Sequence, residues 1–252
     1  MRPSDLMGSS SPMTIAVVIP VFNEERRIAE AVRHTSSLGF DAIVVVDGGS
    51  TDQTRELVTT CSITQDVIPL GLPQTPVTLL STPQGRAGQL NAGAKVCRGE
   101  ILVFLHADTR LPADARQQIE SALADPVIVG GRFDVRFDSH SPWGTVISTF
   151  MNLRSRLTGV ATGDQAIFVR RHVFERLGGF TDIPLMEDVD FSVRLKRAGR
   201  VVPLREAVTT SFRRWERQGP LKTILLMWTL RFLYWIGVSP YRLARLYPTV
   251  RD

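Results

Sequence analysis

Short apolar runs alternate with amphipathic stretches through the first half of the chain. Four of the runs are rich in β-branched residues and predict strands at 15–21, 42–46, 77–80 and 101–105. The stretches that follow them have apolar residues at helical spacing and predict helices at 24–38, 55–61, 87–97 and 112–123. Apolar strands that each lead into a helix are typical of buried parallel strands in an α/β sheet.

The pattern changes after residue 129. Residues 130–137 alternate like a half-exposed strand, and 165–169 predict another strand. Residues 143–157 and 187–198 have helical periodicity, and an apolar segment at 221–238 predicts a last helix. We therefore predict an α/β fold in one domain, with a mostly parallel sheet flanked by helices and a C-terminal helical tail.

Composition and charge exclude several classes to which this protein could belong. With 252 residues, 43% hydrophobic and 22% charged, the chain can bury a core, and global disorder is excluded. Two cysteines exclude a disulfide framework and a four-cysteine zinc site. The first 13 residues lack the apolar core of a secretory signal, so we expect a cytoplasmic protein. From residue 194 onward, 13 Lys and Arg face 3 Asp and Glu, which favours a polyanionic neighbour such as anionic lipid or nucleic acid.

Polar side chains gather where the predicted strands end. Asn23 and Glu24 follow the first strand, Asp47 ends the second, and His106 and Asp108 follow the fourth. Ligands of open α/β sheets bind outside the carboxyl ends of the strands, so we expect a binding site there. Neither G-x-G-x-x-G nor G-x-x-x-x-G-K-[ST] occurs, which disfavours dinucleotide enzymes and P-loop ATPases. Of the nucleotide sites considered, this leaves a mononucleotide pocket that binds its ligand with side chains and a metal.

Five segments in order carry a family resemblance: PVFNEE, VVDGGSTDQT, GRAGQLNAGA, FLHADT and MEDVDF. Over roughly residues 14–215 the chain resembles family 2 glycosyltransferases with the GT-A fold. LHADT and MEDVDF are similar to a small bacterial subgroup that resembles carotenoid-acid (diaponeurosporenoate-type) glycosyltransferases. The resemblance implies transfer of one sugar from a nucleotide-diphosphate sugar to a hydroxyl or carboxyl acceptor, with inversion. The domain then divides into nucleotide-binding and acceptor halves at 14–111 and 112–215. The polar composition of 1–13 predicts a disordered leader, and the basic, aromatic residues of 216–252 predict a helical tail.

The resemblance assigns roles residue by residue. Contacts with the donor nucleotide are expected from Pro20, Asn23, Glu24, Asp47, Arg86, Gln89 and Asn91. Asp108 is expected to hold Mn²⁺ or Mg²⁺ against the diphosphate. Asp188 is the candidate general base, and Glu187 lies beside it. Contacts with the donor sugar or the acceptor are expected from Asp164, Gln165, Arg214 and Trp215, although Asp164 and Gln165 also suit a simple turn before a strand.

Two positions depart from the family pattern. The usual Asp-x-Asp metal motif is here His106-Ala107-Asp108, so His106 is a metal ligand, a donor to phosphate or a packing residue. Imidazole in place of a carboxylate favours Mn²⁺ over Mg²⁺. Processive members carry Gln-x-x-Arg-Trp, whereas Ser211 stands at the glutamine position here. Single-sugar transfer is therefore favoured over polymerisation.

The tail leaves three alternatives open. Its aromatic and apolar residues suit peripheral contact with a membrane and a lipid or terpenoid acceptor, packing on the chain's own core, or a dimer contact. Nucleic acid is disfavoured, because a phosphate-tracking patch would be polar. Two rival functions are a non-catalytic membrane-associated sugar-nucleotide binder and a nucleotidyltransferase, although the latter needs a glycine-rich loop that PVFNEERR does not supply.

Overall fold

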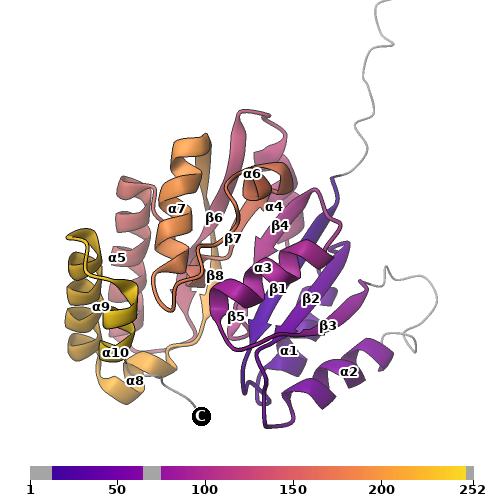
Figure 1. Cartoon of the computed structure of the whole chain (residues 1–252), viewed down its shortest axis with the longest axis horizontal. Coiled ribbons are helices and arrows are strands. Elements are labelled where there is room, and N and C mark those ends of the chain that lie inside the picture. The colour runs from indigo at the N-terminus through magenta and orange to yellow at the C-terminus, as the bar shows by residue number, and fades with distance from the viewer. Residues whose placement is uncertain (1–12, 65–74, 248–252) are drawn as a thin grey trace, which may run out of the picture.

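One mixed sheet organises the part of the chain that the structure, a computed structural model, describes, residues 13–64 and 75–247 (Figure 1). The strands are β1 (Ile15–Val21), β2 (Ala42–Asp47), β3 (Val77–Ser81), β4 (Ile101–Phe104), β5 (Thr109–Arg110), β6 (Ile128–Phe137), β7 (Ile167–Arg170) and β8 (Arg200–Thr210). Their order in the sheet is β3-β2-β1-β4-β7-β6-β8-β5. Apart from Met13, the predicted leader at 1–13 lies outside the described residues.

The first four strands are parallel, as the sequence predicts. Val18 of β1 is in register with Val44 of β2 and Phe104 of β4, and β2 pairs in parallel with β3. Their carboxyl ends therefore lie at one edge of the sheet. In the other half, β7 is antiparallel to both β4 and β6, while β6 and β8 are parallel.

Helices cover the sheet. They are α1 (Ile28–Ser36), α2 (Thr54–Thr64), α3 (Arg86–Val96), α4 (Ala115–Leu123), α5 (Pro142–Thr158), α6 (Arg171–Arg176), α7 (Glu187–Ala198), α8 (Arg213–Gln218), α9 (Pro220–Trp235) and α10 (Pro240–Leu246). The predicted helices thus exist, with shifted ends. The short helices α6, α8 and α10 were not predicted, because each spans too few residues to give a clear period.

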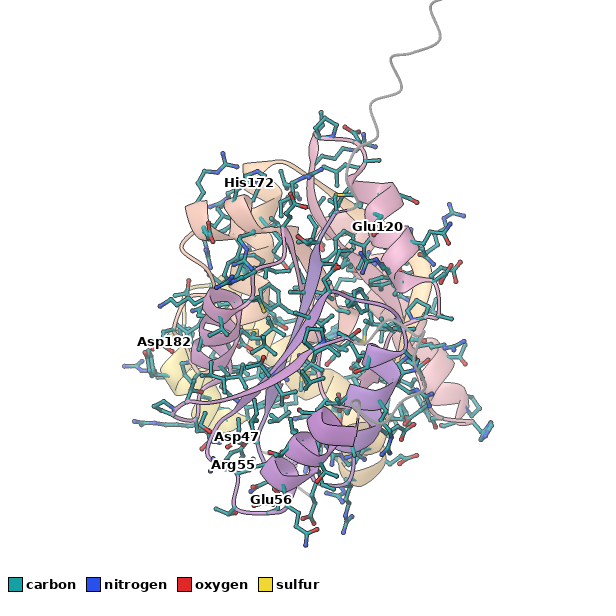
Figure 2. All side chains as sticks on the ribbon, turned by 90° about the vertical axis from the view of Figure 1, so that its right-hand side faces the viewer. Asp47, Arg55, Glu56, Glu120, His172 and Asp182 are labelled. Atoms are coloured by element: carbon teal, nitrogen blue, oxygen red, sulfur yellow. The ribbon has the colours of Figure 1, made fainter. Side chains whose placement is uncertain are left out.

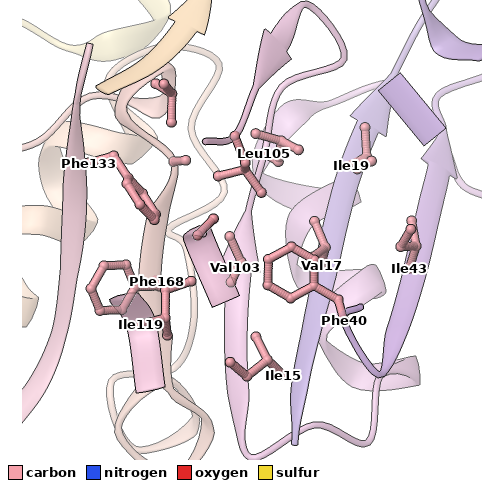
Figure 3. Close-up of a cluster of buried hydrophobic side chains, with 14 of the residues drawn as sticks. Ile15, Val17, Ile19, Phe40, Ile43, Val103, Leu105, Ile119, Phe133 and Phe168 are labelled. Carbon is pink, nitrogen blue, oxygen red and sulfur yellow. The ribbon is translucent and has the colours of Figure 1, made fainter. Parts of the chain in front are cut away.

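The core lies on both faces of the sheet. On one face, Ile15, Val17 and Val103 point toward the side on which Phe133 and Phe168 pack edge to face, with ring centroids 5.9 Å apart (Figure 3). On the other face, Phe104 packs against a cluster of rings contributed by Phe174, Phe180 and Phe191. Strands buried on both faces need the continuous apolar runs that the sequence has.

β6 differs from its prediction as a half-exposed strand. Residues 128–133 are buried, because β6 lies between β7 and β8 inside the sheet. Gly130 and Gly131 permit this close approach. A Cβ on Gly131 would lie 2.3 Å from the Phe168 ring and 2.4 Å from the Val202 carbonyl oxygen.

One local prediction is wrong and one strand was missed, both for physical reasons. The strand predicted at 165–169 begins only at Ile167, because its first predicted residue, Gln165, ends a 3₁₀ turn (Gly163–Gln165). The sequence reasoning missed β8. A register shift opposite Phe133 and Asp134 leaves Arg205 and Glu206 exposed, and this bulge interrupts the alternation on which the prediction depends.

The tail packs on the chain's own domain with one side and leaves its other side exposed. Leu230 of α9 and Leu243 of α10 are fully buried against Met186, just before α7. Side chains on the opposite side of α9 are exposed: Leu221, Leu225, Trp228, Phe232 and Trp235. Figure 1 shows α9 at the same end of the molecule as α5. Among the described residues, no helix combines the length and hydropathy needed to cross a bilayer.

Candidate active site

The ends of β1 and β2 are tied together by side-chain to backbone hydrogen bonds. Asp47 is fully buried, and its carboxylate accepts from the backbone N–H groups of Gly49 and Ser50, each at 3.1 Å. Asn23 has φ 55° and accepts from the Thr51 N–H at 2.8 Å. Asp47 lies near Arg55 at one end of the molecule (Figure 2), with 3.9 Å between Asp47 Oδ2 and Arg55 Nε. Asp47 and Asn23 therefore fix the shape of the two loops where the donor is predicted to bind.

Pro20 and Glu24 belong to the same strand end. Pro20 is in register with Val46 in the β1–β2 ladder. The Glu24 backbone N–H donates to Thr54 Oγ1 at 2.8 Å. Its carboxylate lies 3.8 Å from the guanidinium group of Arg213 at the start of α8. Glu24 thus links the first strand to the segment that leads into the tail.

Gln89 and Asn91 hold α3 in place with their amide groups. Gln89 Nε2 donates to the carbonyl oxygens of Val21 at 2.8 Å and Val46 at 2.7 Å. Asn91 exchanges two 2.8 Å hydrogen bonds with the backbone of Phe180. Because these amides bind backbone groups, they fix the orientation of α3, whose first residue is Arg86.

A small cavity brings charged residues from both halves of the sheet together. It is lined by Arg86, Leu90, Phe104, His106, Gly163, Ile167, Phe180, Glu187 and Asp188. His106 Nδ1 lies 3.1 Å from Asp164 Oδ1 and 3.4 Å from Arg86 Nη2. Arg86 Nη1 lies 3.8 Å from Glu187 Oε1. The structure therefore brings Arg86, His106, Asp164 and the Glu187–Asp188 pair into one site.

Asp188 is oriented by backbone N–H groups. Its Oδ2 accepts from Gly163 and its Oδ1 from Val189, both at 2.7 Å. A Cβ on residue 163 would lie 2.3 Å from His106 Nε2, so only glycine lets the 3₁₀ turn contact both His106 and Asp188. Met186, which precedes the acidic pair, has a left-handed backbone with φ 70° and turns the chain into α7.

The acidic residues of the site differ in their electrostatics. Burial raises the pKa of Glu187, the charge of Asp188 raises it further, and Arg86 opposes both. Burial also acts to raise the pKa of Asp164, but the hydrogen bond with His106 and the positive charges of Arg86 and Arg214 bring it below its usual value. Asp164 is thus held ionised, whereas Glu187 is the carboxyl group that gains a proton more easily.

Asp108 offers one carboxylate to a metal ion. Its Oδ1 accepts a 3.4 Å hydrogen bond from the neighbouring Thr109 hydroxyl. Within residues 13–64 and 75–247, no group of three or more His, Cys, Asp or Glu side chains could hold a metal. Mg²⁺ is commonly bound through one or two carboxylates together with substrate phosphates and water. The donor set therefore fits a cation bound jointly with a diphosphate, and does not fit a site closed by protein ligands.

Two of the residues predicted to contact sugar or acceptor pack against other side chains of the protein, Gln165 fully buried and Trp215 half-buried. Gln165 is fully buried, and its Nε2 donates to Ser155 Oγ at 3.0 Å. Trp215 packs against Phe137 and Phe212, with ring centroids 5.9 and 6.3 Å away.

The sequence reasoning missed a residue that the tail brings back to the site. The guanidinium carbon of Arg214 lies 4.4 Å from the centroid of the Tyr247 ring, just after α10. Burial raises the pKa of Tyr247, Arg214 and Arg86 lower it, and Asp164 and Asp188 raise it. No local pattern marks Tyr247, because its place depends on the folding back of α9 and α10.

The fold is the GT-A fold of glycosyltransferases. A mannosyltransferase from Pyrobaculum calidifontis, solved with GDP-Man and Mn²⁺, has a TM-score of 0.66, with 22% identity, 96% of this chain and 67% of that chain covered. TarS from S. aureus, solved with UDP-GlcNAc, has a TM-score of 0.61, with 17% identity, 79% of this chain and 58% of that chain covered.

The chain belongs to glycosyl transferase family 2, whose family model matches residues 16–178. An undecaprenyl-phosphate 4-deoxy-4-formamido-L-arabinose transferase from Pseudomonas paraeruginosa is 32% identical over 166 residues, which are 63% of this chain and 46% of that protein. The probable glycosyltransferase YdaM from Bacillus subtilis is 25% identical over 224 residues, 81% of this chain and 50% of that protein. The chain thus spans about half the length of the curated relatives that it matches.

Proposed function

We propose that this glycosyltransferase moves one sugar, with inversion, from a nucleotide-diphosphate sugar to a hydroxyl or carboxyl acceptor. The observation that carries the proposal is the Asp188 carboxylate, which two backbone N–H groups orient at a cavity that it shares with Arg86. Asp188 takes the proton of an acceptor hydroxyl as the acceptor oxygen attacks the anomeric carbon. The bond from that carbon to the diphosphate then breaks, and the nucleoside diphosphate leaves.

The donor is proposed to lie along the carboxyl ends of β1, β2 and β4. Arg86 begins α3, so its guanidinium and the helix N-terminus both favour a phosphate group. Asp108 is proposed to hold Mn²⁺ or Mg²⁺ against the diphosphate, where the cation would neutralise charge on the leaving group. The neighbours solved with GDP-Man and Mn²⁺ and with UDP-GlcNAc support a nucleotide-sugar donor.

A lipid-like acceptor and peripheral contact with a cytoplasmic membrane surface complete the proposal. The exposed apolar side of α9 supports it, and so do Phe150 and Leu157 on α5, which are 63% and 77% exposed. Residues 217–247 contain Lys and Arg but no Asp or Glu, which suits an anionic leaflet. The relative that acts on undecaprenyl phosphate supports an acceptor of this kind.

Binding of free nucleotides tests the donor site. We expect one of UDP, GDP, dTDP and CMP to raise the unfolding temperature in the presence of Mn²⁺. Saturation at one hundred times Kd adds about 2.7 kcal/mol to the free energy of unfolding. No stabilisation by any of the four would contradict the proposal. Stabilisation without turnover of the corresponding nucleotide sugar would favour the non-catalytic binder.

Vesicle binding tests the role of the tail. Because Trp228 is 69% and Phe232 58% exposed, the double variant W228E/F232E should retain its fold but bind vesicles rich in phosphatidylglycerol at least about tenfold more weakly. Co-sedimentation with vesicles measures this. V127E is the matched control, because Val127 is 64% exposed between α4 and β6. Equal binding of W228E/F232E and wild type would show that α9 makes no membrane contact.

A further inference from the structure

Arg154 of α5 is a charged residue that the fold leaves without a partner. Its guanidinium makes no hydrogen bond or ion pair with any residue that the structure describes, and its Nη2 atom is buried. Arg156, two residues further along the same helix, has instead a 2.6 Å ion pair with Asp134. A guanidinium has five N–H donors, and buried donors in proteins are normally satisfied. The packing of α5 therefore gives no reason for an arginine at position 154.

Contacts of the neighbouring residue place Arg154 beside the active site. Ser155 accepts a 3.0 Å hydrogen bond from Gln165 of the 3₁₀ turn, and Gly163 of the same turn donates to Asp188. Burial lowers the pKa of Arg154, the charge of Arg132 lowers it further, and the carboxylates of Asp188 and Asp164 raise it. Arg132, only 3% exposed, also has a buried Nη2 without a partner, although its Nη1 binds Asp134. Arg132 and Arg154 thus each have one buried N–H nitrogen unsatisfied, and the positive charge of Arg132 acts on Arg154. An anion between them would satisfy the unpaired nitrogens and reduce the repulsion.

A third unsatisfied guanidinium acts on the same carboxylate. Arg214 makes no hydrogen bond or ion pair within the described chain, its Nη1 is buried, and its charge lowers the pKa of Asp164. Arg214 reaches the site from α8, whereas Arg154 reaches it from α5. The positive charge therefore comes from two different helices. The Arg86 guanidinium, in contrast, already pairs with Glu187.

We propose that Arg154 binds an acidic group of the acceptor, a phosphate or a carboxylate, next to Asp188. The proposal rests on the proposed function and narrows it to acceptors that carry a negative charge. The bond changes remain those of sugar transfer: the acceptor oxygen bonds to the anomeric carbon and the nucleoside diphosphate leaves. Arg154 supplies N–H donors that fork onto two anionic oxygens, and its positive charge favours an anionic acceptor over an uncharged one.

Phosphate binding at a saturating concentration of the nucleotide that binds best tests this role. Isothermal titration would use inorganic phosphate and phenyl phosphate on wild type, R154Q and the control R136Q. Arg136 lies on β6 with an exposed side chain that donates to Thr209 Oγ1, so R136Q removes the same charge away from the site. R154Q should weaken binding of both probes at least about tenfold, the loss of a charge-assisted hydrogen bond. R136Q should leave it unchanged.

Two further measurements separate the rival roles of Arg154. The unfolding temperature of R154Q should equal or exceed that of wild type, because an unpaired and partly buried charge is removed; a lower value would show that Arg154 is structural. The affinity for the nucleotide should not change; a loss would assign Arg154 to the donor diphosphate. Failure of wild type to bind either probe would also overturn the proposal. Failure of every nucleotide to bind would instead refute the proposed function, and the phosphate titration without nucleotide would still test Arg154.

Discussion

The D188N variant should transfer sugar about 10²–10⁴ times more slowly than the wild type, the usual contribution of a general base. Asparagine has nearly the same shape, and its side-chain oxygen can still accept the hydrogen bond that Asp188 accepts from Gly163 at 2.7 Å. The fold and the cavity should therefore persist, while the group that takes the proton is lost. Turnover of the nucleotide sugar under saturating donor measures the effect.

Asp182 offers a matched control for Asp188. It lies on the exposed loop before α7 (Figure 2), so D182N makes the same chemical change outside the cavity and should leave turnover unaltered. Nucleotide binding by D188N should equal that of wild type, because Asp188 is not proposed to contact the nucleotide. Undiminished transfer by D188N would remove Asp188 from the mechanism and direct attention to Glu187.

The D108A variant should lose the part of nucleotide stabilisation that depends on Mn²⁺. Asp108 supplies the single carboxylate proposed to hold the cation, and no cluster of three metal-binding side chains replaces it within the described chain. Where wild type gains about 2.7 kcal/mol at one hundred times Kd, D108A should keep only the metal-independent part. Unfolding temperatures with nucleotide, with and without Mn²⁺, measure this difference.

Two variants sharpen the metal experiment. D114A removes an exposed carboxylate before α4 that makes no capping hydrogen bond, and it should behave as wild type. H106A tests the imidazole, whose Nδ1 lies 3.1 Å from Asp164. Retained Mn²⁺ dependence in D108A would contradict the assignment of Asp108. Loss of it only in H106A would place the metal at the imidazole.

The parallel half of the sheet could be predicted because its strands are apolar on both faces. That pattern is local, and the rule for the carboxyl ends then places Asp47, Asn23 and His106 at one edge without further information. The acidic pair Glu187–Asp188 was identified from motif resemblance, and the structure brings it to the cavity that contains Arg86.

The roles of Gln89, Arg154 and Tyr247 could not be predicted, because they depend on contacts between residues far apart in the sequence. The amide of Gln89 reaches the backbone of Val21 and Val46, which no spacing rule could distinguish from contact with a nucleotide. In the sequence, nothing distinguishes Arg154 from the other charged residues of an amphipathic helix. Tyr247 lies 61 residues beyond Met186, and its position follows from how the tail folds back onto α7. Patterns of period two or 3.6 contain no information on contacts of this kind.

The left-handed backbone of Met186 connects the tail to the proposed general base, Asp188. A non-glycine residue in this conformation costs about 1–2 kcal/mol, and such a cost persists only where the surrounding structure enforces it. The side chain of Met186 is held by Leu230 and Leu243 of the tail. The strained turn before Glu187 and Asp188 is therefore held in place by residues more than 40 positions later in the chain. The geometry of the proposed base therefore depends on the packing of the tail against Met186.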